Sequence, residues 1–121
     1  MGKRILTVDD SKTIRDMVSF TLRGAGFEVM EAEDGERALA ALKSASADLV
    51  ITDLNMPNMD GLALIRALRA DPAHRALPIL MLTTEGDAQK KSEGREAGAT
   101  GWMVKPFSPD KLIELVKRVC G

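Results

Sequence analysis

Short apolar runs that alternate with helix-like segments are the feature that most constrains the fold of this chain. The runs cover residues 5–8, 28–30, 49–52, 79–82 and 102–104. Three of them are continuous rather than alternating in polarity, which is typical of strands covered on both faces by other elements. The strand–helix order occurs five times. It predicts an α/β fold with a parallel sheet, helices on both faces and right-handed crossovers.

The segments between the runs begin and end with residues that are common at helix ends. Ser11 and Asp34 are favoured N-caps, and Ser108 precedes a proline at the first helical position. Gly24 and Gly26 are placed to end the first helix. We therefore expect helices to begin after each of these capping residues.

Residues 87–97, between the fourth and fifth runs, differ from the other helical segments. This stretch contains Gly94, and its only apolar side chains are Ala88 and Ala97. A helix formed here buries little apolar surface, so we expect it to be weakly held.

The composition suits one compact domain, expected to span residues 1–121. The chain has 121 residues, of which 45% are hydrophobic, and this is enough for a core. Its net charge of −1 gives no reason to expect binding to nucleic acid or to a membrane surface. The single cysteine, Cys120, cannot form an internal disulfide, and the first apolar run is too short for a signal peptide or a membrane span. These features predict a cytoplasmic protein.

Polar side chains stand at the ends of the expected strands, where sites form in open parallel sheets. They are Asp9 and Asp10 after the first strand, Asp53 at the end of the third, Thr83 and Thr84 at the end of the fourth, and Lys105 after the fifth. Because the carboxyl ends of parallel strands share one edge, we expect these groups to converge there.

Such a group of side chains has a recognisable chemistry. Carboxylates packed together repel each other and favour a bound cation. Hard oxygen ligands without histidine or a cysteine pair suit Mg²⁺ or Mn²⁺ rather than zinc. A cation, a lysine and a hydroxyl also match the negative oxygens of a phosphoryl group. Asp53 is the best candidate for a nucleophile that forms an acyl phosphate, because it ends the most central strand.

Each of these residues also has an ordinary structural interpretation. Asp9 and Asp10 are favoured helix caps, and Asp53 is a common turn residue. Thr83 is a β-branched residue suited to a strand, and a lone lysine such as Lys105 is usually solvated. Only the joint placement of these residues on one edge favours the functional interpretation.

Four motifs, in order at the strand ends, resemble the receiver family of bacterial two-component response regulators, and most closely its single-domain chemotaxis members. The motifs are VDDS at residues 8–11, DLNMPNMDG at 53–61, LTT at 82–84 and KPF at 105–107. The resemblance spans essentially the whole chain. It implies a single receiver domain without an output domain, with a doubly wound, flavodoxin-like (βα)5 fold and a five-stranded parallel sheet in the order 2-1-3-4-5.

The resemblance also implies roles for the acidic residues. Asp53 would be the phosphorylated residue. Asp10, Asp53 and the backbone carbonyl of Asn55 would hold Mg²⁺, with Mn²⁺ as an alternative ion, and Asp9 would help through a water molecule. Lys105 would pair with the phosphoryl group, and its bond to the following proline would be cis.

Further residues match the positions of the family's switch. The Thr83 hydroxyl would move to bond the phosphoryl group, and the Thr84 amide would assist. Asn55 and Glu85 match positions that orient the water which hydrolyses the acyl phosphate. The switch position on the fifth strand, usually tyrosine or phenylalanine, is Trp102 here, which leaves the geometry of its movement open. We expect its indole to be at least partly exposed in the unphosphorylated state.

The implied function is a signalling switch rather than a conventional enzyme, although the domain would catalyse its own phosphorylation and dephosphorylation. The donor would be a phosphohistidine on a sensor histidine kinase. The target would be a flagellar-motor switch protein or another protein at the face of the fourth helix, fifth strand and fifth helix, and the resemblance allows a separate phosphatase. The alternative is a phosphate sink or relay between the kinase and a histidine phosphotransferase. A monomer that binds neither nucleic acid nor membrane is expected.

Three lysines fall on that expected face: Lys90, Lys91 and Lys111. They suit a partner segment that is acidic and apolar. They are equally compatible with an ordinary solvated helix surface.

Overall fold

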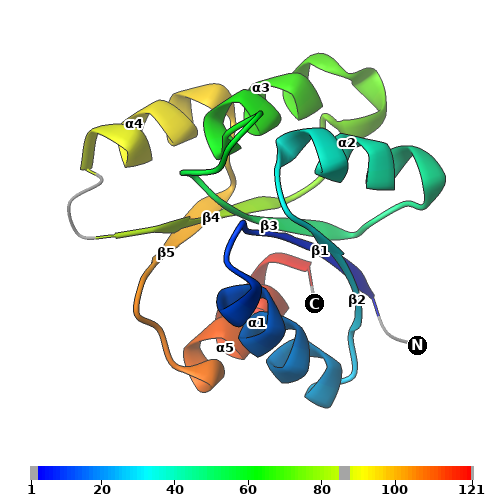
Figure 1. Ribbon diagram of the computed structural model, residues 1–121, viewed down its shortest axis with the longest axis vertical. Helices are drawn as coiled ribbons and strands as arrows, with labels where there is room; N and C mark the ends of the chain where they lie inside the picture. The colour runs from blue at the N-terminus through cyan, green and yellow to red at the C-terminus, as the bar shows by residue number, and fades with distance from the viewer. Residues whose placement is uncertain (1–2, 85–87, 121) are drawn as a thin grey trace.

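A computed structural model describes residues 3–84 and 88–120 of the chain. Its sheet has five strands in the order β2-β1-β3-β4-β5, and every neighbouring pair is parallel. A helix follows each strand in the sequence (Figure 1). The predicted fold class and strand order are therefore confirmed.

The bounds of the elements agree closely with the apolar runs. The strands are β1 (Arg4–Val8), β2 (Glu28–Ala32), β3 (Leu49–Asp53), β4 (Ile79–Thr83) and β5 (Gly101–Val104). The helices are α1 (Lys12–Gly24), α2 (Gly35–Ser44), α3 (Gly61–Ala70), α4 (Ala88–Ala97) and α5 (Pro109–Cys120), with the short 3-10 helix η1 (Pro72–His74) after α3. Within the described residues, no helix is long and apolar enough to cross a membrane.

The strand β2 is longer than its apolar run predicts. Glu31 and Ala32 continue the parallel pairing, opposite Thr7 and Val8 of β1. Glu31 is exposed, and its carboxylate forms an ion pair with Arg15 of α1, at 3.3 Å between Oε1 and Nε. Backbone pairing thus extends the strand through a residue whose polarity suggests a loop.

Two cores lie on opposite faces of the sheet. In Figure 1, α2, α3 and α4 cover one face, and α1 and α5 cover the other. Because alternate strand residues point to opposite faces, Leu6 and Val50 pack in the core that includes α2 and α3 residues. Their neighbours Ile5 and Ile51 pack in the core that includes α1 and α5 residues. This double burial explains the continuous apolar runs.

The predicted caps position the helices at the ends of the strands. The side chains of Ser11, Asp34 and Ser108 each accept a hydrogen bond from the backbone N–H three residues further on, at 3.3, 2.9 and 3.1 Å. These bonds satisfy N–H groups that the first turn of a helix leaves without a partner. The capping predictions are confirmed.

The helix α4 is held differently from the others, as its composition predicts. Within its residues, only Gly94 is buried. A Cβ added at Gly94 would lie 2.0 Å from the sulfur of Met81 on β4, so the absence of a side chain permits this close approach. Apart from Gly94 and from Ala97, which packs against the core at the end of the helix, the described contacts of α4 come from charged side chains, Lys90 with Asn55 and Lys91 and Arg95 with Trp102.

Candidate functional site

Three carboxylates meet at the carboxyl edge of the sheet. One carboxylate oxygen from each of Asp9, Asp10 and Asp53 lies within 4.8 Å of the others. They meet because β1 and β3 are neighbours in the sheet and both strands end at this edge. Asp9 is only 1% exposed, Asp53 is partly buried and Asp10 is exposed. The cluster is therefore closed on the side of the core and open towards solvent.

Lys105 reaches this cluster from the loop after β5. Its ammonium nitrogen lies 3.3 Å from Asp53 Oδ1 and 3.5 Å from Asp9 Oδ2. Its backbone N–H donates to the carbonyl of Thr83 at 2.6 Å, which continues the β4–β5 pairing beyond the end of β5. The Lys105–Pro106 peptide bond is cis, as predicted. One lysine thus pairs with two of the three carboxylates in the cluster.

The electrostatics of Asp9 reflect this imbalance. Burial raises the pKa of its carboxyl above the ordinary value, the hydrogen bond from the Ser11 N–H opposes the rise, and the charge of Asp53 adds to it. Oδ1 accepts that Ser11 bond at 2.9 Å, whereas Oδ2 is buried and has no hydrogen-bond partner among the described residues. The Lys105 ammonium lies 3.5 Å from this buried oxygen, farther than in a close hydrogen bond, so the oxygen is well suited to an additional positive charge.

The donor set fits a hard divalent cation. The cluster offers only carboxylate oxygens, the ligands that Mg²⁺ and Mn²⁺ prefer, and its ligand atoms are close enough to share one ion. The exposure of Asp10 leaves room for water, which Mg²⁺ retains when it binds. Asp10 and Asp53 are the residues best placed to contribute, with Asp9 behind them.

The predicted switch residues on β4 lie beside the cluster. Thr83 is buried at the end of the strand, and its hydroxyl donates to the carbonyl of Met103 on β5 at 3.4 Å. Thr84 follows and is exposed. Glu85, the other residue predicted to shape the path of water, lies outside the described residues.

Asn55 lies in the loop between β3 and α3 and is exposed. Its side-chain oxygen accepts a hydrogen bond from the ammonium of Lys90 on α4. The sequence did not suggest this contact, because the two residues are 35 positions apart and share no motif. It connects the helix α4 to the loop that follows the central strand.

A network around Asp34 holds the same loop, and it too was missed. Asn58 has the left-handed φ of 65°, and its side-chain amide donates to Asp34 Oδ2 at 2.9 Å. The Gly35 N–H donates to the carbonyl of Met59 at 2.9 Å. The backbone N–H of Arg37, followed by the Asn58 amide, holds the pKa of Asp34 below its ordinary value. An asparagine in a turn was the available signal, since asparagine tolerates positive φ better than most residues.

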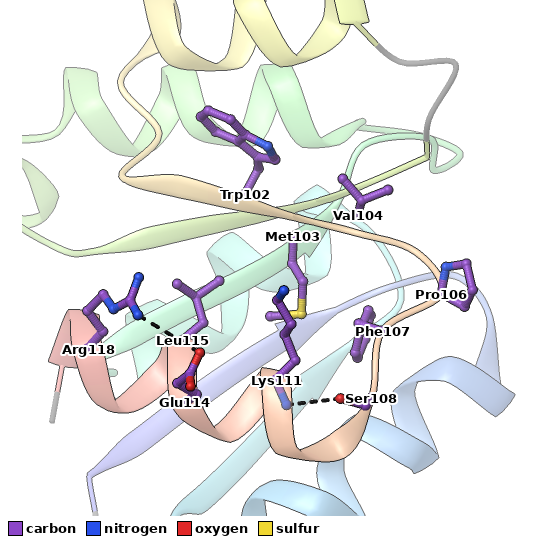
Figure 2. A pocket seen from close by; sticks show the side chains of 10 residues that line it. All are labelled: Trp102, Met103, Val104, Pro106, Phe107, Ser108, Lys111, Glu114, Leu115 and Arg118. Carbon is purple, nitrogen blue, oxygen red and sulfur yellow. Dashed lines mark hydrogen bonds and ion pairs between the residues drawn. The ribbon is translucent and has the colours of Figure 1, made fainter.

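Trp102 lies on the edge strand β5 and points towards α4, whereas its neighbour Met103 points towards α5 (Figure 2). The indole is 36% exposed, which confirms the expected partial exposure. Lys91 Nζ and Arg95 Cζ lie 5.2 and 5.6 Å from the ring centroid. Both are cation–π contacts that favour the outward position of the ring.

A groove of about 430 Å³ lies between β5 and α5. Its apolar lining includes Phe107 and Leu115, and its charged lining includes Lys111, Glu114 and Arg118 (Figure 2). Glu114 and Arg118 face each other at 3.9 Å. The groove therefore combines apolar surface with a net positive charge.

Known proteins resemble this chain over almost its full length. The Response regulator receiver domain family matches residues 5–117. The chemotaxis protein CheY of Pseudomonas aeruginosa is 42% identical over 117 residues, which cover 96% of this chain and 94% of that protein. The phosphate regulon transcriptional regulatory protein PhoB of the same organism is 40% identical over 98% of this chain, which spans only 52% of PhoB.

Solved structures agree in fold. The chemotaxis response regulator CheY4 of Vibrio cholerae has a TM-score of 0.93 and 49% identity, covering 98% of this chain and 99% of that one. The receiver domain of NtrX from Brucella abortus has a TM-score of 0.89 and 34% identity, covering 96% and 97%. Together with the family match over residues 5–117, these similarities show that this chain belongs to the response regulator receiver domain family.

Proposed function

We propose that this receiver domain is a cytoplasmic phosphoacceptor switch of a two-component phosphorelay, with Asp53 as the phosphoacceptor and Mg²⁺ as its cofactor. The observation that carries the proposal is the position of the Asp53 carboxylate. It ends the central strand, clusters with Asp9 and Asp10, and lies 3.3 Å from the Lys105 ammonium. Membership of the family implies a histidine kinase as the partner that supplies the phosphoryl group.

The chemistry follows from these groups. An oxygen of the Asp53 carboxylate attacks the phosphorus of a phosphohistidine, the phosphorus–nitrogen bond breaks, and imidazole leaves with the electron pair. The Lys105 ammonium then pairs with the phosphoryl oxygens, and the Thr83 hydroxyl and the Thr84 amide turn towards them. Asp10, Asp53 and the Asn55 carbonyl would hold Mg²⁺, with Asp9 helping through a water molecule, and the bound ion would supply positive charge that reduces the repulsion between the carboxylate and the phosphoryl oxygens. The domain thus catalyses its own phosphorylation from a phosphodonor and its own dephosphorylation.

Phosphorylation of Asp53 is tested by intact mass spectrometry after incubation with acetyl phosphate and Mg²⁺. We expect the parent to gain one phosphoryl group, and Asp53→Asn to gain none because an amide is a poor nucleophile. Asp110→Asn is the matched control, since Asp110 is an exposed residue of α5. A phosphoryl group on Asp53→Asn at a site away from the acidic cluster would show that another residue is the acceptor.

We further propose that the output is chemotactic and that the target is a flagellar-motor switch protein. Support comes from the 42% identity to a chemotaxis protein of nearly the same length. The groove between β5 and α5 adds to it, because apolar surface beside Lys111 and Arg118 suits an acidic, partly apolar segment. The alternative, a phosphate sink or relay, requires no such target.

Binding to a purified motor switch protein distinguishes the two outputs. Beryllium fluoride mimics the acyl phosphate, and we expect it to tighten binding about tenfold or more. Lys111→Glu should weaken that binding by reversing a charge in the groove. Lys43→Glu, an exposed change on α2, should leave it unchanged. Equal affinity with and without beryllium fluoride would favour the sink or relay.

A further inference from the structure

The helix α4 reaches the loop of the proposed phosphorylation site through one side chain. Lys90, in the first turn of α4, donates a hydrogen bond from its ammonium to the side-chain oxygen of Asn55. Asn55 is two residues beyond Asp53 in the sequence. The contact therefore connects the helix directly to the immediate surroundings of the phosphoacceptor.

Other cations of α4 have a different position. Lys91 and Arg95 are four residues apart, so they share one helix face, and both lie over the ring of Trp102. Lys90 is one residue earlier and therefore about 100° away around the helix axis. Two cations of α4 therefore contact Trp102, and the third, Lys90, contacts the loop after β3.

The direction of the bond determines what the Asn55 amide can do. A primary amide has one carbonyl acceptor and one NH₂ group with two donors. Lys90 has no acceptor atom, so it engages the oxygen, and the charge makes this bond stronger than a neutral one. The NH₂ group of Asn55 is thereby left to bond water or phosphoryl oxygens on the side of the site.

We propose that Lys90 is a positioning residue for the hydrolysis of the Asp53 acyl phosphate, acting through Asn55; this inference rests on the proposed function. The Asn55 NH₂ orients a water molecule whose oxygen attacks the phosphorus. The bond between phosphorus and the Asp53 oxygen breaks, and the Asp53 carboxylate is regenerated. Inorganic phosphate leaves with the water oxygen and its protons, one of which can pass to solvent. Lys90 touches no reacting atom and sets the orientation of the amide.

The kinetic test follows the loss of the phosphoryl group by intact mass after the small donor is removed. Lys90→Met is expected to slow the loss about three- to tenfold, because an amide that is no longer held orients water less often. Lys90→Arg, which keeps charge and donors, should stay within about twofold of the parent. Gln89→Met, an exposed change in the same turn, should also stay within about twofold.

A double-mutant cycle separates positioning from a general effect on the fold. In an Asn55→Ala background, Lys90→Met should change the rate by less than about 1.5-fold, because its effect passes through the missing amide. An equal slowing in both backgrounds would overturn the inference. So would a Lys90→Met protein that loses its phosphoryl group at the parent's rate.

A second readout needs no phosphoryl group. The side-chain ¹H–¹⁵N resonances of Asn55 should shift in Lys90→Met and stay in place in Gln89→Met. Unshifted resonances in Lys90→Met would overturn the inference by removing its structural basis. If the parent accepts no phosphoryl group, the proposed function fails and this inference with it. Normal phosphorylation with an unchanged decay rate defeats this inference alone.

Discussion

The individual side chains of the acidic cluster differ in burial and in the charges around them. Asp9 is buried and keeps a carboxylate oxygen without a hydrogen-bond partner among the described residues, whereas Asp10 is exposed. Lys105 lies within 3.5 Å of Asp9 and Asp53. One ammonium cannot neutralise three carboxylates, so the metal-free site has excess negative charge. Changes at Asp10 therefore report on charge, with little loss of packing.

Asp10→Ala should lose Mg²⁺ binding while the domain stays folded. Removing one of three like charges relieves repulsion, so the metal-free variant should unfold at the parent's temperature or slightly above it. Thermal unfolding with and without Mg²⁺ measures this, because a bound ion raises the parent's midpoint. Asp110→Ala, at an exposed position of α5, should respond to Mg²⁺ like the parent. A similar Mg²⁺ response in Asp10→Ala would exclude Asp10 as a ligand.

Asp34→Asn should destabilise the domain in a pH-dependent way. The Arg37 N–H and the Asn58 amide lower the pKa of Asp34 below its ordinary value of 3.8. A carboxyl with a lowered pKa in the folded state contributes stability above that ordinary value and loses it as the pH falls through the lowered one. The deficit of the variant should be full at pH 7 and shrink below about pH 4. Urea unfolding at several pH values tests this, and a constant deficit would contradict it.

At the scale of elements, close approaches position the site as much as side chains do. The helix α3 begins directly against the end of β3, and the N–H of Gly61 donates to the carbonyl of Leu54 at 3.0 Å. A Cβ on Gly61 would lie 2.2 Å from the carbonyl oxygen of Asp53. Because that neighbour is backbone, it cannot move aside without shifting the end of the strand.

Gly61→Ala should therefore lower the free energy of unfolding by about 1–3 kcal/mol or more, as overpacking does. It should also slow phosphorylation by acetyl phosphate, since Asp53 would move. Gly24→Ala is the matched control: an added Cβ there meets nothing within 4 Å, and alanine favours helix. Chemical denaturation measures both variants. If Gly61→Ala were as stable as the parent, β3 and α3 would not be held in this tight approach.

Trp102 and α4 make a second pair of coupled elements. Trp102 is the single tryptophan of the chain and there is no tyrosine, so intrinsic emission reports this position. When Thr83 turns towards a phosphoryl group, we expect the indole to leave Lys91 and Arg95 and turn inward. Burial of a large side chain is worth roughly 1.5–3 kcal/mol, enough to bias a two-state switch.

Beryllium fluoride should then shift Trp102 emission to shorter wavelength and reduce quenching by iodide. Thr83→Ala should weaken both effects, because its hydroxyl is the group that moves. Identical emission and quenching at saturating beryllium fluoride would make Trp102 a static packing residue. Lys43→Met on α2, an exposed change away from the indole, should behave like the parent.

Across the whole molecule, features that leave a repeated pattern in the sequence could be predicted, whereas single contacts and turns could not. The fold was predictable because strands buried on both faces have continuous apolar runs, and the acidic cluster was predictable because each of its residues follows a run. The left-handed turn at Asn58 and the bond between Lys90 and Asn55 leave no periodic pattern. The extension of β2 depends on pairing with β1, and the polarity of neighbouring residues in the sequence cannot predict this pairing.

The attachment of α4 also has a consequence for the surroundings of the protein. Its described contacts to Asn55 and Trp102 come from charged side chains, and within its residues only Gly94 is buried. Dissolved ions screen such exposed contacts, whereas they leave apolar cores intact. Rising ionic strength should therefore loosen α4 before any other helix, and its amide hydrogens should exchange with solvent first. The helix α4 would then rearrange more easily in a cell with a higher salt concentration.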